Sequence, residues 1–246
     1  MKTLTLAVLA ILIAGRAFCY TADSVVVAEK KHSPVKLSLR LHSRGLFSYG
    51  GRLVTSNPVV DFTLNYTGKN WGIQFFKAVD VADHHTPINF TLAVVNRPFH
   101  LGKRLTITPA MGVLLEQYES LADQGSDAAM MITTSYRIST SLSIEHTSLA
   151  GNLVLEPSLR DWINRIRLMY SHRHMDVTLF GWHNNGLFDG NAYVAAGASV
   201  FISRLKLTGP LTAQVGITGL WMAAASDEQT RKGASGVFAT LGFALN

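Results

Sequence analysis

Residues 35–43 read VKLSLRLHS, a run in which valine and leucine alternate with Lys36, Ser38 and Arg40. Successive side chains of a β-strand point to opposite faces, so this period of two predicts a strand with one apolar and one polar face. A soluble sandwich would pack the apolar face inside, whereas a membrane barrel would turn it outward to lipid. The fold therefore depends on how the pattern continues along the chain.

The alternation recurs to the end of the chain in segments of about ten residues separated by turns, which is the strand length of a membrane barrel. We predict about twelve strands. They lie near residues 35–43, 58–66, 71–79, 88–96, 105–117, 128–138, 141–150, 162–171, 175–183, 191–202, 205–219 and 235–245. The expected fold class is all-β, a transmembrane antiparallel up-and-down β-barrel formed by residues 35–246.

The connectors between these segments alternate in length, as they do in outer-membrane barrels. Short ones are expected at 67–70, 97–104, 138–141, 171–174 and 203–204. Long ones are expected at 43–57, 80–87, 119–127, 151–161, 184–190 and 222–234. An even number of strands places both ends of the barrel on the short-turn side, which is the periplasmic side in such proteins.

Aromatic residues gather near the ends of the expected strands, where a ring with a polar edge favours the membrane–water interface. They are Tyr66, Trp71, Tyr118, Tyr136, Trp162, Tyr170, Trp182 and Trp221. Charged residues make up only 15% of the chain, and no internal apolar run reaches the length of a membrane-spanning helix. Together these features favour the membrane barrel over the soluble periplasmic β-protein, which remains an alternative.

The chain begins with features of a secretory signal: Lys2, an apolar core over 4–14, and small residues before a cleavage site. We expect residues 1–19 to be the signal peptide, cut after Cys19 or after Ala22, and residues 20–34 to form a short periplasmic extension. Cys19 is the only cysteine, so the mature chain is expected to have no disulfide or zinc–thiolate site. The expected location is the bacterial outer membrane.

With the apolar faces turned outward, the opposite faces carry charged residues into the barrel interior. The expected lumen-lining residues are Lys36, Arg40, Asp61, Glu116, Glu145, Arg165, Arg167, Asp176 and Lys206. Buried charges need partners, so these residues form either salt bridges that plug the barrel or the wall of a narrow, water-filled pore. The sequence leaves both alternatives open.

The export signal, the alternating strands and the final segment GVFATLGFALN at 236–246 resemble bacterial outer-membrane β-barrel proteins, in particular the small single-chain type common in Bacteroidota-like genomes. The resemblance implies that the barrel assembly machinery recognises the last strand. Family members commonly end in an aromatic residue, whereas this chain ends in Asn246, with Phe243 three positions earlier.

A second, local resemblance lies in residues 146–151, HTSLAG, where His146 and Ser148 share the outward face of one expected strand. It is similar to the His-x-Ser pair on the exterior of outer-membrane lipid A deacylases. The resemblance implies a histidine base and a serine nucleophile for ester hydrolysis. Leu149 stands where that motif has asparagine, and the facing strand offers no outward carboxylate to orient the histidine.

The function expected from the sequence is therefore a non-enzymatic outer-membrane barrel, either a narrow passive channel or a structural and surface-interaction protein. An outer-membrane lipid A-type ester hydrolase using His146 and Ser148 is the enzymatic alternative. The expected partners are outer-membrane lipids, lipopolysaccharide, the barrel assembly machinery and small solutes. The net charge of +6 comes with no nucleic-acid motif, and no cofactor or metal site is expected.

Overall fold

The computed structural model describes residues 34–44, 57–81, 89–116, 127–151, 153–154, 162–185, 192–226 and 235–245. All of them belong to one compact unit, residues 33–246. The expected signal peptide (1–19) and almost all of the expected extension (20–34) lie outside the described residues. No helix in the described part of the chain is long and apolar enough to cross a membrane.

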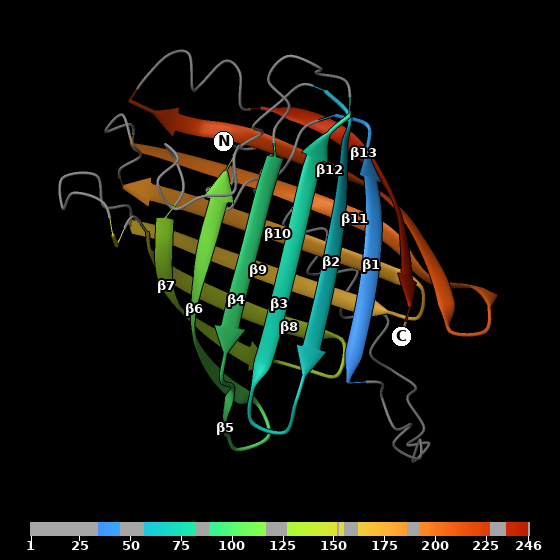
Figure 1. Ribbon diagram of the computed structural model, residues 1–246, viewed down its shortest axis with the longest axis horizontal. Helices are drawn as coiled ribbons and strands as arrows, with labels where there is room; N and C mark the ends of the chain where they lie inside the picture. Colours follow the sequence, from blue (N-terminus) through green and yellow to red (C-terminus); the bar gives the residue numbers. More distant parts are fainter. Residues whose placement is uncertain are drawn as a thin grey trace. The chain divides into compact units, whose positions relative to one another are not determined.

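The described residues form antiparallel β-strands that follow one another around a closed ring (Figure 1). The strands are β1 (Val35–His42), β2 (Val59–Thr67), β3 (Gly72–Asp80), β4 (Asn89–Asn96), β5 (Phe99–Leu101), β6 (Leu105–Glu116), β7 (Asp127–Arg137), β8 (Leu142–Ala150), β9 (Trp162–His172), β10 (Met175–Asn185), β11 (Ala192–Thr208), β12 (Leu211–Ala225) and β13 (Gly236–Leu245). The first strand pairs with the last, and β4 pairs with β6. The expected transmembrane-type barrel is confirmed.

Strands β4 and β5 are two parts of a single strand, so the thirteen hydrogen-bonded elements make a barrel of twelve strands. Asn96 pairs with Ala110 and Phe99 pairs with Ile107, which is one continuous register. The ladder is interrupted where Pro98 and Pro109 lie, because proline has no backbone N–H to donate. The short turn expected at 97–104 is therefore confined to 102–104, where Gly102 has a φ of 71°.

The turn expected at Ser203–Arg204 is wrong, because β11 continues through these residues to Thr208. A register shift between Ile202 and Leu205 marks a bulge there, and Arg204 has a φ of 57°. The chain turns at residues 209–210 instead, where Gly209 has a φ of 51°. The bulge inserts residues into the strand without ending its pairing with β12.

The apolar faces of the strands lie on the outside of the barrel. Exposed large apolar residues occur along most of the strands, among them Leu39, Ile73, Met111, Ile132, Ile166, Val200, Ile217 and Val237. In a soluble sandwich these side chains would form the core. The alternative of a sandwich with its apolar faces packed inside is therefore wrong.

Apolar side chains also occupy part of the interior, toward the ends of the strands that join the long connectors. One buried cluster comes from β8 to β13 and contains Leu149, Ile163, Trp182, Tyr193, Ala195, Leu220, Met222 and Phe238. A second cluster, from β2 to β4, contains Val59, Ala78, Leu92 and Val94. These side chains narrow the space inside the barrel at that level.

Two inward-facing aromatic rings lie flat against the barrel wall because a glycine faces each of them on the next strand. Phe180 pairs with Gly197, and Phe201 pairs with Gly216. A Cβ on Gly197 would lie 2.4 Å from the ring of Phe180, and one on Gly216 would lie 2.3 Å from the ring of Phe201. The missing side chains thus make room for the rings beside the wall and leave space in the middle of the barrel.

Candidate functional site: a charged cavity inside the barrel

The barrel encloses a cavity of about 460 Å³, to which nine strands contribute side chains. Its polar lining consists of Arg40, His42, Asp61, Thr63, Gln74, Arg165, Arg167, Thr178, Ser199, Thr218 and Thr240. Its apolar lining consists of Phe76, Leu92, Phe180, Trp182, Phe201 and Phe238. This size and mixture suit a small solute rather than a polymer.

One wall of the cavity is a hydrogen-bonded cluster at the closure of the barrel, where β1 lies between β2 and β13. Arg40 donates from Nε to Asp61 Oδ1 over 2.9 Å, and His42 Nε2 lies 2.7 Å from Asp61 Oδ2. On its other side, His42 Nδ1 lies 2.9 Å from Thr240 Oγ1. One imidazole thus links the second strand to the last strand across the first.

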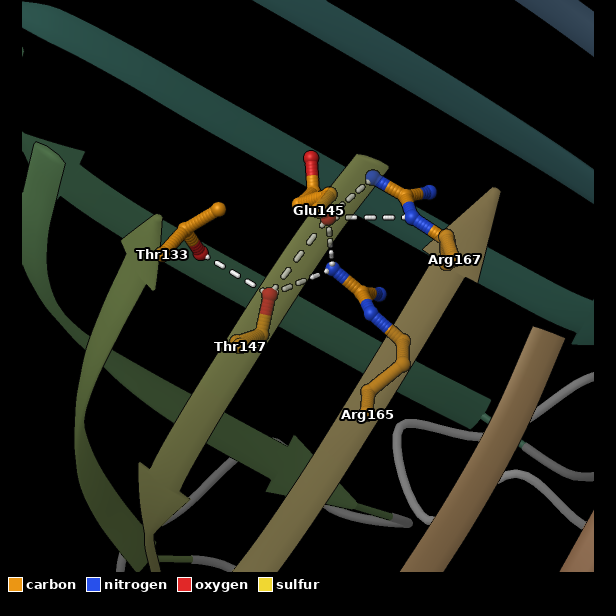
Figure 2. Close-up of polar contacts among 5 residues, drawn as sticks. All are labelled: Thr133, Glu145, Thr147, Arg165 and Arg167. Carbon is orange, nitrogen blue, oxygen red and sulfur yellow. Dashed lines mark hydrogen bonds and ion pairs between the residues drawn. The ribbon is translucent and has the colours of Figure 1, made fainter. Parts of the chain in front are cut away.

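A second cluster, from β7, β8 and β9, surrounds Glu145 (Figure 2). Its Oε1 accepts hydrogen bonds from Arg165 at 3.0 Å and from Arg167 at 3.0 and 2.5 Å. Arg165 also donates to Thr147 Oγ1 over 3.0 Å, and Thr147 lies 3.0 Å from Thr133 Oγ1. The register explains the contacts, because Glu145 pairs with Arg167 and Thr147 pairs with Arg165.

The two clusters lie on opposite sides of the ring. Strands β2 to β8 separate β1 from β9 in one direction, and β10 to β13 separate them in the other. Both Arg40 and the pair Arg165 and Arg167 line the same cavity. A solute in the cavity would therefore have guanidinium groups on two sides.

The arginines are more exposed than the carboxylates that they contact. The side chains of Arg40, Arg167 and Arg165 are 34%, 33% and 19% exposed, whereas those of Asp61 and Glu145 are 1% and 11% exposed. Three cations thus stand against two carboxylates, of which Asp61 is almost fully buried and Glu145 does not line the cavity. The surface offered to the cavity is cationic, and the guanidinium of Arg165 also lies over the ring of Trp182 at 5.1 Å.

The other described residues expected in the lumen, Lys36, Asp176 and Lys206, do not line this cavity. Lys36 and Lys206 are exposed, near the short-turn ends of β1 and β11. Asp176 is bonded at the same end of the barrel to Ser171 and Ser203, and to Arg204 at 3.0 Å. The side chain of Glu116 lies outside the described residues.

The lumen-lining residues predicted from the sequence do not include His42, Thr240 or Arg204. The parity that places Arg40 inside also places His42 inside, so the alternation of 35–43 contained that signal. Thr240 and Arg204 are identified only by the pairing of distant strands, which the pattern of a single segment does not contain.

His146 is exposed on the outside of the barrel, in register with Thr134 and Ile166. Ser148 Oγ donates to Asn164 Oδ1 over 3.1 Å. Among the described residues no hydrogen bond joins His146 to Ser148, and no carboxylate is bonded to His146. Three or more metal-ligating side chains do not come together anywhere in the described segments.

No protein-family model matches the chain, and no curated protein sequence matches it. Among solved structures, the NanC porin in its rhombohedral crystal form is similar to the chain over 85% of this chain and 99% of that one, with a TM-score of 0.57 and 12% identity. A protein solved in a study of in-meso crystallization of membrane proteins is similar over 85% and 82% of the two chains, with a TM-score of 0.50 and 11% identity. At these identities the likeness shows the fold alone, which is a closed antiparallel β-barrel.

Proposed function

We propose that the protein is a bacterial outer-membrane barrel that acts as a narrow passive channel and prefers small anionic solutes. The exposed apolar exterior supports a place in a membrane, because no described segment of the chain covers this surface and lipid would do so. The porin-type fold supports a passive role.

The observation that carries the proposal is the arrangement of charge in the cavity. Arg40 approaches from one side and Arg165 and Arg167 from the other, and their carboxylate partners are much less exposed than they are. Fixed cations beside a water-filled passage raise the local concentration of anions and lower that of cations. The apolar clusters at the long-connector level keep the passage narrow.

The test is conductance of the purified protein in planar bilayers with a salt gradient across the membrane. We expect small single-channel currents and a reversal potential with the sign of an anion-selective channel. We expect Arg167→Gln to move that potential toward zero. Cation selectivity in the wild type would contradict the anion preference. No current in either protein would contradict the channel and favour the structural and surface-interaction role.

The closure of a small barrel by the strands of one chain supports the Bacteroidota-like type. An outer-membrane location supports contacts with lipopolysaccharide and with the assembly machinery. The lipid A-type hydrolase remains the enzymatic alternative because His146 and Ser148 lie on consecutive outward positions of β8. A lipid A mass shift that disappears in Ser148→Ala would establish it, and an unchanged lipid A mass in cells that express the wild type would remove it.

A further inference from the structure

Arg97 is a cation within an apolar row on the outside of the barrel. The register of β4 and β5 against β6 is continuous, so Val95, Arg97, Phe99 and Leu101 share the outward face. All four are exposed. The backbone N–H of Arg97 donates to Pro109 O over 3.1 Å, which fixes its position between the two strands.

Two aromatic rings hold the guanidinium of Arg97. Its Cζ lies 5.0 Å from the centre of the Phe99 ring and 5.8 Å from the centre of the Trp71 ring. Contacts with ring faces leave the N–H donors at the edge of a guanidinium free, and those donors match a phosphate in a bidentate manner. No carboxylate in the described segments is bonded to Arg97.

The neighbours along the row define the environment of this cation. Phe99 and Leu101 continue the apolar exterior beyond Arg97 toward the turn at 102–104. The guanidinium of Arg97 therefore lies within the apolar surface and not beyond its edge. A charge at the level of an apolar surface is costly unless an anion of the interface lies beside it. The lipid headgroup layer supplies such anions at the ends of a barrel.

We propose that Arg97, held between Trp71 and Phe99, is a binding site for the phosphate of a phospholipid headgroup in the leaflet at the short-turn end. Lys103 in the adjoining turn is exposed and adds positive charge, so the site favours an anionic lipid over a zwitterionic one. The site rests on insertion of the barrel in a membrane and is independent of conduction through its interior.

Native mass spectrometry of the folded protein in detergent tests the site, with phosphatidylglycerol titrated as the probe. We expect Arg97→Gln to weaken lipid binding about tenfold, since one charge-assisted contact to phosphate is lost. Arg97→Lys keeps the charge without the planar guanidinium, and its affinity for the lipid is expected to lie between those of the wild type and Arg97→Gln. Arg104→Gln is the matched control, because it removes a cation from the same hairpin that contacts neither ring, and it is expected to change binding by no more than about twofold.

Heat-modifiable migration on a gel verifies that each variant is folded before binding is compared. Wild-type binding in Arg97→Gln would overturn the site. An equal loss in Arg104→Gln would show diffuse attraction to the charged hairpin, which overturns it as well. Inorganic phosphate is added as a competitor, and displacement of the lipid by phosphate at comparable concentration would identify a free-anion site instead of a lipid site.

Discussion

Glu145 shows how one carboxylate oxygen holds two cations in the barrel interior. Its Oε1 accepts from both Arg165 and Arg167, and the side chain is only 11% exposed. Because the two arginines come from the neighbouring strand, their heads would repel each other and lose hydrogen bonds if the carboxylate were neutral. The residue therefore fixes the position of two of the three guanidiniums that line the cavity.

We expect Glu145→Gln to lower the free energy of unfolding by about 2 kcal/mol and to increase anion selectivity. The amide keeps the shape of the side chain but removes the countercharge. Urea unfolding in vesicles, followed by tryptophan fluorescence, measures the first effect, and the reversal potential measures the second. Thr133→Val is the control, since it removes a hydrogen bond of the same cluster without changing its charge. Unchanged stability and selectivity in Glu145→Gln would contradict the role given to the pair.

At this scale the sequence assigned residues to a face of each strand but did not show which residues meet. Parity alone indicated Arg40, Asp61, Glu145, Arg165 and Arg167 as one polar set. Their division into two clusters required the register of each strand pair, and a shift of one residue would have reversed the faces. Whether the polar set forms a passage remains a prediction that conductance tests.

At the scale of a strand pair, Gly197 determines how β10 and β11 present Phe180 to the cavity. An alanine Cβ there would lie 2.4 Å both from the ring of Phe180 and from the backbone oxygen of Gly219. Because the backbone atom cannot move aside without disturbing the ladder, the substitution strains the wall and pushes the ring toward the cavity.

Gly197→Ala is expected to destabilise the folded barrel by about 1–3 kcal/mol and to reduce the single-channel current. Gly181→Ala on the paired strand is the matched control. Its added Cβ would meet the nearest side-chain atom, on Ile166, at an ordinary 3.5 Å. Unfolding in urea gives the stability of each variant. Equal effects of the two alanines would show that the loss reflects glycine in a strand generally rather than the position of the ring.

Element boundaries were predicted less well at the two hairpins that contain Pro98 and Pro210 than at the other short turns. The predicted strand ends at residue 96 and Pro98 falls within the expected turn at 97–104, although the register against β6 continues through Phe99–Leu101. The Gly209–Pro210 pair is itself a turn signal, and it marks the true reversal between β11 and β12. The sequence alone did not separate it from the bulge at Ser203–Arg204.

At the scale of the whole molecule, the exposed apolar surface and the closed ring depend on each other. A strand-built protein in lipid must satisfy all of its backbone groups internally, and the pairing of β1 with β13 achieves this by removing the two free edges that an open sheet would have. The strand count, the alternation of faces and the alternation of connector lengths each pointed to this closure in advance. The sequence did not predict the side-chain contacts of His42 with Asp61 and Thr240, which link β2 to β13 across β1.

The depth of a residue in the membrane should therefore determine the cost of a charge on the outside of the barrel. We expect Ile217→Arg, in the middle of β12, to lower stability by about 2–4 kcal/mol, because the charge would enter the centre of the bilayer. Leu207→Arg, near the short-turn end of β11, is expected to cost about 0–1 kcal/mol. Both side chains are more than half exposed, at 57% and 53%, so a water-soluble protein would tolerate both equally. Unfolding in vesicles measures the difference.

The length of β11 has a consequence for contacts with other chains. Its pairing with β10 ends at Ile202, whereas its pairing with β12 continues to Thr208, so the stretch 204–208 has a neighbouring strand on one side only. A bare strand flank of this kind is a template on which a second polypeptide can add itself. The kink at Arg204 and the positive charge of Lys206 both oppose such an addition. We therefore expect the hairpin of β11 and β12 to extend into the aqueous compartment without pairing with the strands of other chains.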